Sequence, residues 1–273
     1  MRTLRGYRPF ADPTNAEPLW RSLRRAFPDA LAACLMPNHL HLLDETSDPR
    51  RDRERLVRVA AASTRRIGAR RLWEPAPSPE PIAPDKLLRQ IRYLHLNPPR
   101  AGLVDDPLAY RCSTHRGVVG AEHEPWVPAQ RIARLTGRPV CGLAESFHDY
   151  VSSDPSVSPS GSPFPERAPT RPFAVVPLAA IIAAAHSAAF WCPRSVERHA
   201  TVLLGVDQGW PVARIADALG IDPRSVRRFA QRANPALLDS ARLCLGDPRL
   251  CADSSIRSAM PPRMSGKRAF ARP

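Results

Sequence analysis

The sequence has few cysteines, and none are paired in the way that zinc sites require. Six are present, and no two are separated by only two residues. This spacing excludes a zinc ribbon and provides no disulfide framework. Reduced thiols in a cytoplasmic protein are the simplest interpretation. The six are Cys34, Cys112, Cys141, Cys192, Cys244 and Cys251.

Long hydrophobic runs are also missing. The N-terminus has no apolar core of the kind that secretory signals carry. The apolar stretch 175–189 is too short to span a bilayer comfortably and contains His186, so it is predicted to be a buried helix. No GxxxxGKS loop occurs, so the sequence does not indicate an ATP site. We therefore expect a cytoplasmic protein with no membrane partner.

Acidic residues are few relative to basic ones. The chain has 40 Lys and Arg against 26 Asp and Glu, a net charge of +14. A surface this basic repels itself unless a polyanion neutralises it, so nucleic acid is the expected partner. The excess is largest in residues 223–273, which hold 11 basic and 3 acidic side chains. An arginine-rich chain with ordinary solvated faces is the competing interpretation.

Proline is abundant, with 32 residues that divide the chain into segments. Two short apolar runs, 30–35 and 39–43, flank Pro37-Asn38 and predict two strands joined by a tight turn. Helical periodicity predicts helices over residues 12–27, 53–71, 86–97 and 128–137. Pro98 is predicted to end the third of these, because a proline disfavours α geometry in the residue before it.

A Ser/Pro-rich segment divides the sequence into two halves. Its composition cannot build a core, so it is predicted to be a linker. The predicted organisation is a first domain over 1–150, the linker over 151–172, a helical DNA-binding domain over 173–250, and a basic disordered tail over 251–273.

Four residues of the first half predict a metal-assisted site. His39 and His41 alternate on a predicted strand and therefore share one face, while Tyr93 and Asn97 share a helix face at a spacing of four. Two imidazoles and an amide oxygen can hold a divalent cation that polarises a phosphodiester, and a phenol can attack phosphorus. The alternatives are a pair of unrelated surface histidines, a packing tyrosine and an asparagine that ends a helix. His95 points elsewhere and is predicted to lie at the helix surface.

These motifs resemble a known family. Residues 36–43 (MPNHLHLL) look like the HUH metal motif of single-tyrosine transposases. Residues 92–104 (RYLHLNPPRAGLV) are similar to the segment that carries the nucleophile, in particular that of REP-associated tyrosine transposases. The resemblance covers roughly the first half of the chain.

The resemblance implies a fold and a set of roles. It implies an α+β domain with an antiparallel sheet of the ferredoxin-like or RRM-like kind. Tyr93 would be the catalytic nucleophile, and His39, His41 and Asn97 would bind Mg²⁺ or Mn²⁺. The DNA substrate would be single-stranded or a hairpin.

Residues 211–232 carry a second motif, typical of a helix-turn-helix. Gly220 stands where the turn needs a left-handed residue, and Asp222 and Pro223 begin the second helix. This arrangement favours binding of duplex DNA in the major groove over an ordinary helical hairpin. The predicted DNA-binding residues are Arg224, Ser225, Arg227, Arg228, Gln231 and Arg232.

The leading hypothesis is a DNA strand transferase that cleaves and rejoins DNA through a covalent phosphotyrosine. A catalytically inactive, domesticated DNA-binding or regulatory protein of the same fold is the alternative from a different class. A metal-dependent nuclease without a durable covalent intermediate is a third. The sequence leaves open whether the protein is a monomer or a homodimer.

Overall fold

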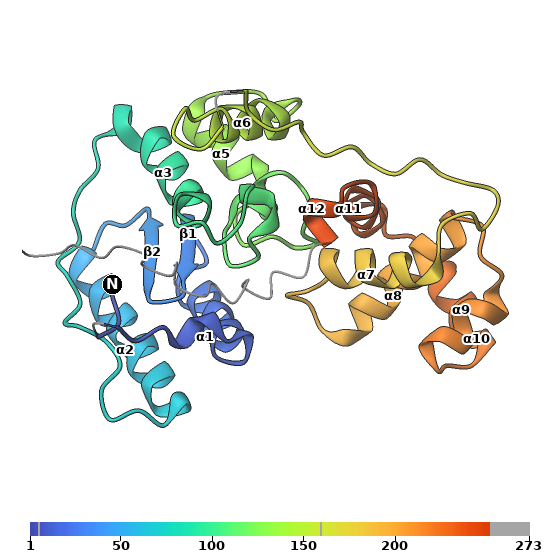
Figure 1. The fold of residues 1–273 in the computed structure, drawn as a ribbon, viewed down its shortest axis with the longest axis horizontal. Helices are drawn as coiled ribbons and strands as arrows, with labels where there is room; N and C mark the ends of the chain where they lie inside the picture. The colour runs from blue at the N-terminus through green and yellow to red at the C-terminus, as the bar shows by residue number, and fades with distance from the viewer. Residues whose placement is uncertain (5, 159, 252–273) are drawn as a thin grey trace, which may run out of the picture.

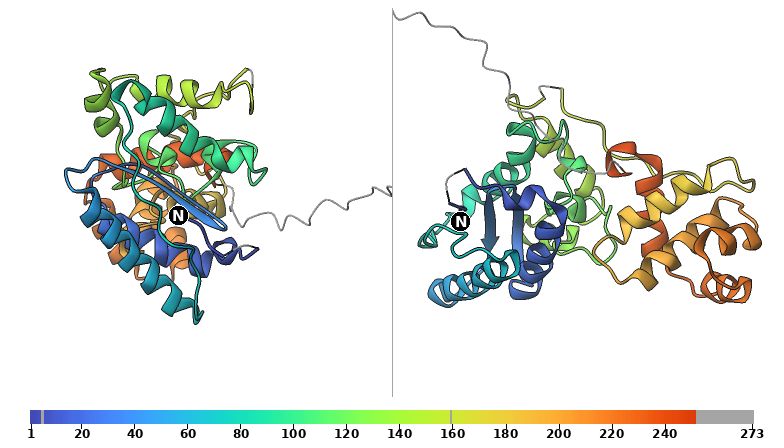
Figure 2. Two further views of the ribbon diagram at one scale, coloured as in Figure 1. Left: turned by 90° about the vertical axis from the view of Figure 1, so that its left-hand side faces the viewer. Right: turned by 60° about the horizontal axis from the view of Figure 1, so that its bottom comes forward.

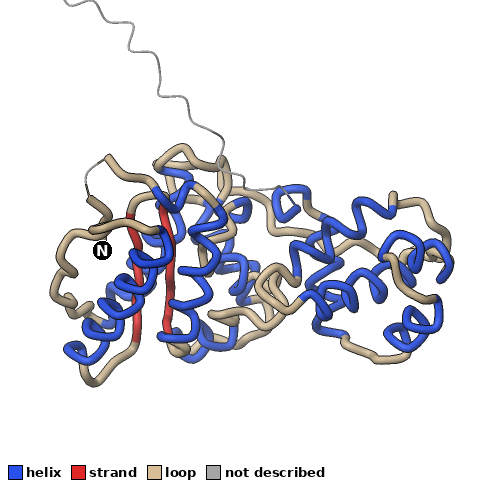
Figure 3. Tube along the Cα trace, turned by 90° about the horizontal axis from the view of Figure 1, so that it is seen from below, coloured by secondary structure: helices blue, strands red, loops and turns tan. Residues whose placement is uncertain are grey.

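The computed structural model describes residues 1–4, 6–158 and 160–251 (Figure 1). The first half combines one β-hairpin with helices, and the second half of the described chain is helical. Figure 3 shows both strands in the first half, beside each other. None of the described helices combines the length and the apolarity that crossing a bilayer requires.

The hairpin has the two strands that the sequence predicts. Strand β1 (Ala30–Met36) pairs with β2 (His39–Asp44) in antiparallel register, with Cys34 opposite His41. All of β1 is buried, whereas β2 is only partly buried apart from Leu40. The hairpin is therefore a core element that keeps one face of β2 accessible to solvent.

The ferredoxin-like sheet that the family resemblance implies is not found in the described residues, where the sheet has two strands. The neighbouring segments make single bridges instead: Arg2 with His39, Thr3 with Trp73, and Cys34 with Ser113. The segment that follows Trp73 is rich in proline, which cannot donate to a ladder. This part of the fold prediction was wrong.

Helices cover both faces of the hairpin (Figure 2). Helix α3 (Leu87–Arg100) packs on β1, and α1 (Pro13–Ala26) packs with α2 (Pro49–Ile67) on the other side. The rest of the first half consists of short elements. They are η1 (Pro9–Ala11), η2 (Pro84–Lys86), η3 (Pro107–Ala109), α4 (His115–Val118), α5 (Ala129–Thr136) and α6 (Leu143–Ser152).

Pro98 does not end α3, contrary to the sequence-based prediction. The helix continues through Pro98 and Pro99 to Arg100. A proline at position 98 cannot donate to the carbonyl of Leu94, but the Asn97 side chain approaches that oxygen at 3.5 Å and donates to the Tyr93 carbonyl at 3.1 Å. The asparagine amide thus partly replaces the missing backbone donor, and the helix extends by one turn.

The second half is formed by six described helices. They are α7 (Leu178–Ala188), α8 (Arg194–Asp207), α9 (Val212–Leu219), α10 (Pro223–Ala230), α11 (Pro235–Gly246) and α12 (Pro248–Cys251). The predicted buried helix over 175–189 corresponds to α7, whose Ile181 and Ala184 are fully buried. Apart from Cys251, the predicted basic tail lies outside the described residues.

The two halves share a hydrophobic cluster. Leu108 and Val119 of the first half pack with Leu204 and Leu243 of the second. At its edge the Arg116 side chain, 1% exposed, donates to the Leu108 carbonyl and, across the boundary, to the Ser187 hydroxyl and the Leu250 carbonyl. The halves are therefore joined by buried apolar and polar contacts.

Residues 160–172 of the Ser/Pro segment cross from the first half to the second half and contact it (Figure 1). The Gln208 amide donates to the Pro169 carbonyl at 2.9 Å, and Arg249 donates to the Pro163 carbonyl at 2.7 Å. Phe164 packs against the shared cluster. The segment adds contacts to a core without building one of its own, and the domain boundaries stay a prediction.

Three histidines form a buried row in the first half. The rings of His95 and His115 lie 5.1 Å apart, and His115 is 3.0 Å from His148 between ring nitrogens. His95 is fully buried with Nε2 3.0 Å from the Thr114 hydroxyl, so its predicted place at the helix surface was wrong. Burial lowers the pKa of His95 to about 3 and also lowers those of His115 and His148.

We expect the protein to lose stability as the pH falls from 7 to 4. Below its ordinary pKa of 6.5, His95 binds a proton in the unfolded chain but not in the folded one, so acid favours unfolding. At pH 4 this residue alone contributes a loss of about 3 kcal/mol. Urea unfolding at several pH values measures the loss. The His95→Gln variant should show a shallower pH dependence, and an unchanged dependence would contradict the assignment to His95.

Candidate active site and nucleic-acid interface

The structure brings three of the four predicted catalytic-site residues into a row of rings. His39 and His41 lie on the same side of β2 with ring centroids 4.8 Å apart. The Tyr93 ring of α3 lies 6.0 Å from that of His41 and is 42% exposed. Two imidazoles and an accessible phenol thus meet where α3 crosses the edge of the hairpin.

Both imidazoles are suited to act as neutral ligands. Partial burial, together with Arg2 and the N-terminal ammonium, lowers the pKa of each to about 4, so both are unprotonated at neutral pH. The His39 Nδ1 lies 2.8 Å from the side-chain amide oxygen Oδ1 of Asn38. If Nδ1 carries the proton in this contact, Nε2 of His39 is left with a free lone pair, as in many metal-bound histidines.

Asn97 lies one helical turn from Tyr93 on α3. Its side-chain nitrogen donates to the Tyr93 carbonyl, which leaves the amide oxygen as the atom that can face a cation. Among the described residues, no group of three or more His, Cys, Asp or Glu side chains is arranged to hold a metal ion. A cation here would therefore depend on the two histidines and this amide oxygen.

Two arginines near this row were missed by the sequence reasoning. The Arg100 guanidinium lies 5.5 Å from the centroid of the Tyr93 ring and is held by Asp154 at 3.1 Å. Arg2 bridges to His39 through the backbone and lowers the pKa of both histidines. The spacing of seven residues between Tyr93 and Arg100 on one helix was a signal for the first. Arg2 had no such signal in the sequence, because only the fold brings it next to the two histidines.

Helices α9 and α10 form the predicted helix-turn-helix. Gly220 takes the left-handed conformation at the turn, with φ 60°. Asp222 caps α10 by accepting from the Arg224 backbone nitrogen at 2.6 Å. Behind them, a side-chain carbon at Gly205 of α8 would lie 2.9 Å from Ile215, so a glycine lets α8 and α9 approach closely. Val226 of α10 completes this core.

The outer face of α10 is basic and open. Its guanidinium groups have no ion-pair or hydrogen-bond partner in the described part of the chain, and only Ser225 of the predicted set is partly buried. Just after the C-terminal end of α10, the Arg232 carbonyl lies 2.9 Å from the Nε2 atom of His199. The exposed members are Arg224, Arg227, Arg228, Gln231 and Arg232.

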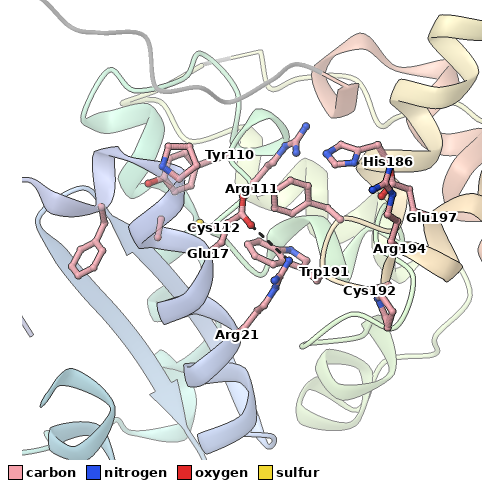
Figure 4. A pocket seen from close by; sticks show the side chains of 15 residues that line it. Glu17, Arg21, Tyr110, Arg111, Cys112, His186, Trp191, Cys192, Arg194 and Glu197 are labelled. Atoms are coloured by element: carbon pink, nitrogen blue, oxygen red, sulfur yellow. Dashed lines mark hydrogen bonds and ion pairs between the residues drawn. The ribbon is translucent and has the colours of Figure 1, made fainter. Parts of the chain in front are cut away.

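A cavity of about 670 Å³ lies where the two halves meet, and none of the predicted site residues lines it. Figure 4 shows Glu17 and Arg21 of α1 on one side, and His186 and Glu197 of α7 and α8 on the other. On the first side Arg21 pairs with Glu17, and on the second the His186 Nδ1 lies 3.1 Å from a Glu197 carboxylate oxygen. The cavity depends on the packing of the two halves, so sequence reasoning had no signal for it.

Comparison with known proteins supports the second motif. A family model described as winged helix-turn helix matches residues 199–240, from within α8 to within α11. Neither the comparison with curated proteins nor that with solved structures yields a match. The helix-turn-helix prediction is confirmed, and this domain indicates DNA binding. The match does not reach the first half, whose transposase resemblance stays a prediction.

Proposed function

We propose that the protein binds duplex DNA by placing α10 in the major groove. The observation that carries this proposal is the open arginine face of α10, on the second helix of a helix-turn-helix that the family comparison also identifies. Arginine is the side chain best suited to bidentate contacts with guanine and with phosphate. The cap at Asp222 holds the first turn of α10 in place, where base contacts are made in this class of motif.

Replacing Arg224, Arg227 and Arg228 together by Gln is expected to weaken duplex binding by the full chain about 100-fold or more at low salt. If all three contact phosphates, the slope of log K against log salt should become shallower by about 2.7. Fluorescence anisotropy with a labelled duplex measures the affinity and its dependence on salt. A matched control replaces the exposed Arg134, Arg138 and Arg167, which removes the same charge elsewhere. Equal losses in the two variants would contradict a recognition role for α10.

We further propose that the first half is a DNA strand transferase that acts through Tyr93. The accessible phenol beside two neutral imidazoles favours this activity over a packing role for the tyrosine. The Tyr93 oxygen attacks phosphorus, a phosphotyrosine bond forms, and the bond to the 3′ oxygen breaks. The phenol loses its proton, and the departing 3′ oxygen gains one.

The mixed nitrogen and oxygen donors suit Mn²⁺ or Mg²⁺ loosely, and the two imidazoles would also accept zinc; His39, His41 and the Asn97 amide oxygen are the residues that would hold the cation. Such a cation would polarise the scissile phosphate as a Lewis acid. Arg100, fixed beside the Tyr93 ring by Asp154, would add positive charge close to the attacking oxygen. A catalytically inactive DNA-binding protein is the alternative, and formation of a covalent adduct with DNA separates the two.

A further inference from the structure

Helix α2 carries a row of arginines that neither the hairpin site nor the helix-turn-helix uses. The helix holds seven arginines against two acidic residues, a net charge of +5. Three of them, Arg51, Arg58 and Arg65, are spaced seven residues apart. Positions seven apart are two turns along the same side of a helix, so the three guanidinium groups form one row about 21 Å long.

The row lies on the side of α2 that faces solvent. Leu56, Val59 and Ile67 of this helix pack against the core of the first half, and Ala60 is buried there. At 100° per residue, Arg51, Arg58 and Arg65 project from the opposite side, and all three are exposed. The core packing thus fixes the direction in which the row points.

The arginines of the row, like Arg66, have no partner among the described residues, whereas the other three arginines of α2 each have one. Arg50 pairs with Glu54 at 3.5 Å, Arg55 pairs with Asp52 at 2.9 Å, and Arg53 donates to the Ala76 carbonyl at 2.9 Å. Within the described residues, no ion pair or side-chain hydrogen bond involves the guanidinium groups of the row. Asp52 and Arg55 neutralise each other on one flank of the helix. Glu54 lies on the face of the row, between Arg51 and Arg58, but it is neutralised by Arg50, so this face keeps the positive charge of the row.

The side chains between these arginines favour a backbone partner over base recognition. Ala61 and Ala62, which lie between Arg58 and Arg65, are small and exposed, so a polyanion can approach the helix closely. The row contains none of the Asn or Gln side chains that read adenine, and its arginines can bind phosphate oxygens as well as guanine. Because the row is about 21 Å long, its three guanidinium groups can contact phosphates spread along the surface of a duplex.

We propose that the outer face of α2, defined by Arg51, Arg58 and Arg65, is a second DNA-contacting surface that binds the phosphate backbone of duplex DNA. Helix α2 and helix α10 lie toward opposite ends of the molecule but on the same side in the views of Figures 1 and 2. The proposal rests on the proposed duplex binding by α10 and extends it to a surface in the first half. The buried contacts between the halves hold the α2 surface and the α10 surface in one relative position.

The test replaces Arg51, Arg58 and Arg65 together by Gln in the full chain. Because these side chains are exposed and unpartnered, circular dichroism and the unfolding midpoint should stay unchanged. Duplex binding should weaken by about tenfold or more at low salt, and the salt slope should become shallower by about 2.7 through the loss of three phosphate contacts. The loss should be the same for duplexes of unrelated sequence, because phosphate contacts carry no sequence information.

Two comparisons make the outcome decisive. The variant with Gln at Arg134, Arg138 and Arg167 loses the same net charge, and it should keep the wild-type salt slope. If this control and the α2 variant weaken equally, or if the α2 variant binds like wild type, the outer face of α2 is only a solvated surface and the proposal is overturned. If wild-type protein fails to bind any duplex, the proposed function of α10 is overturned first. Loss of binding in the α10 variant alone would support α10 and contradict α2.

Discussion

The Tyr93→Phe variant is expected to form no covalent adduct with DNA, whereas the wild-type protein forms one. The substitution keeps the ring that lies against His41 and removes only the oxygen that would attack phosphorus. Tyr93 is 42% exposed, so the fold should survive the loss of one surface hydroxyl. Incubation of full-length protein with labelled single-stranded DNA and Mn²⁺, followed by a denaturing gel, measures the adduct.

Two further variants sharpen this experiment. Tyr7 is 43% exposed and lies outside the row of rings, so Tyr7→Phe is a matched control that should keep full adduct formation. His39→Ala removes an imidazole ligand but leaves the nucleophile, and it should give little adduct. If Tyr93→Phe cuts DNA as well as the wild type, Tyr93 is not the nucleophile and a nuclease without a covalent intermediate is favoured. If no protein acts on any DNA tried, the inactive DNA-binding alternative is favoured.

Replacing Arg116 by Met is expected to destabilise the protein by about 3–5 kcal/mol. Methionine keeps most of the apolar stem but leaves the Leu108 carbonyl and the Ser187 hydroxyl without the donor that Arg116 supplies. The Leu250 carbonyl loses one of two donors and keeps the Ser187 hydroxyl. Glu122, 3.9 Å from Arg116 and 7% exposed, would lose the positive charge that opposes the rise in its pKa caused by burial. Urea unfolding at pH 7 measures the loss.

A surface substitution and a compensating one test whether this loss comes from buried polar groups. Arg138→Met, on an exposed residue, should change stability by no more than about 0.5 kcal/mol. Adding Glu122→Gln to Arg116→Met should recover part of the loss, because the uncompensated buried carboxylate is removed. An Arg116→Met variant within about 1 kcal/mol of wild type would contradict a buried polar connection between the halves.

Features set by neighbouring residues could be predicted from the sequence. The Pro-Asn turn between two apolar runs located the hairpin, and alternation along β2 placed His39 and His41 on one side. Gly220 and Asp222 located the helix-turn-helix in the same way. In each instance the determining interaction spans only a few residues, so local pattern was sufficient.

Features set by residues far apart in the sequence could not be predicted from the sequence. The passage of α3 through Pro98 depends on the orientation of the Asn97 side chain, and the burial of His95 depends on Thr114 and Phe147 from later segments. The larger sheet was implied by the family resemblance alone, whereas the local apolar pattern predicted only the two strands that are found in the described residues. The cavity between the halves depends on tertiary packing and has no local signature.

The buried contacts of Arg116 have a consequence for synthesis on the ribosome. Its acceptor at Leu250 is 134 residues further along the chain, so it is translated about 7–27 s later at 5–20 residues per second. During that interval Leu108 and Val119 lack the second-half residues that cover them. The nascent first half therefore emerges with an uncovered apolar patch beside Arg116, and transiently exposed apolar surface of this kind is prone to aggregation. The cluster shared by the two halves is completed only after most of the described chain has been made.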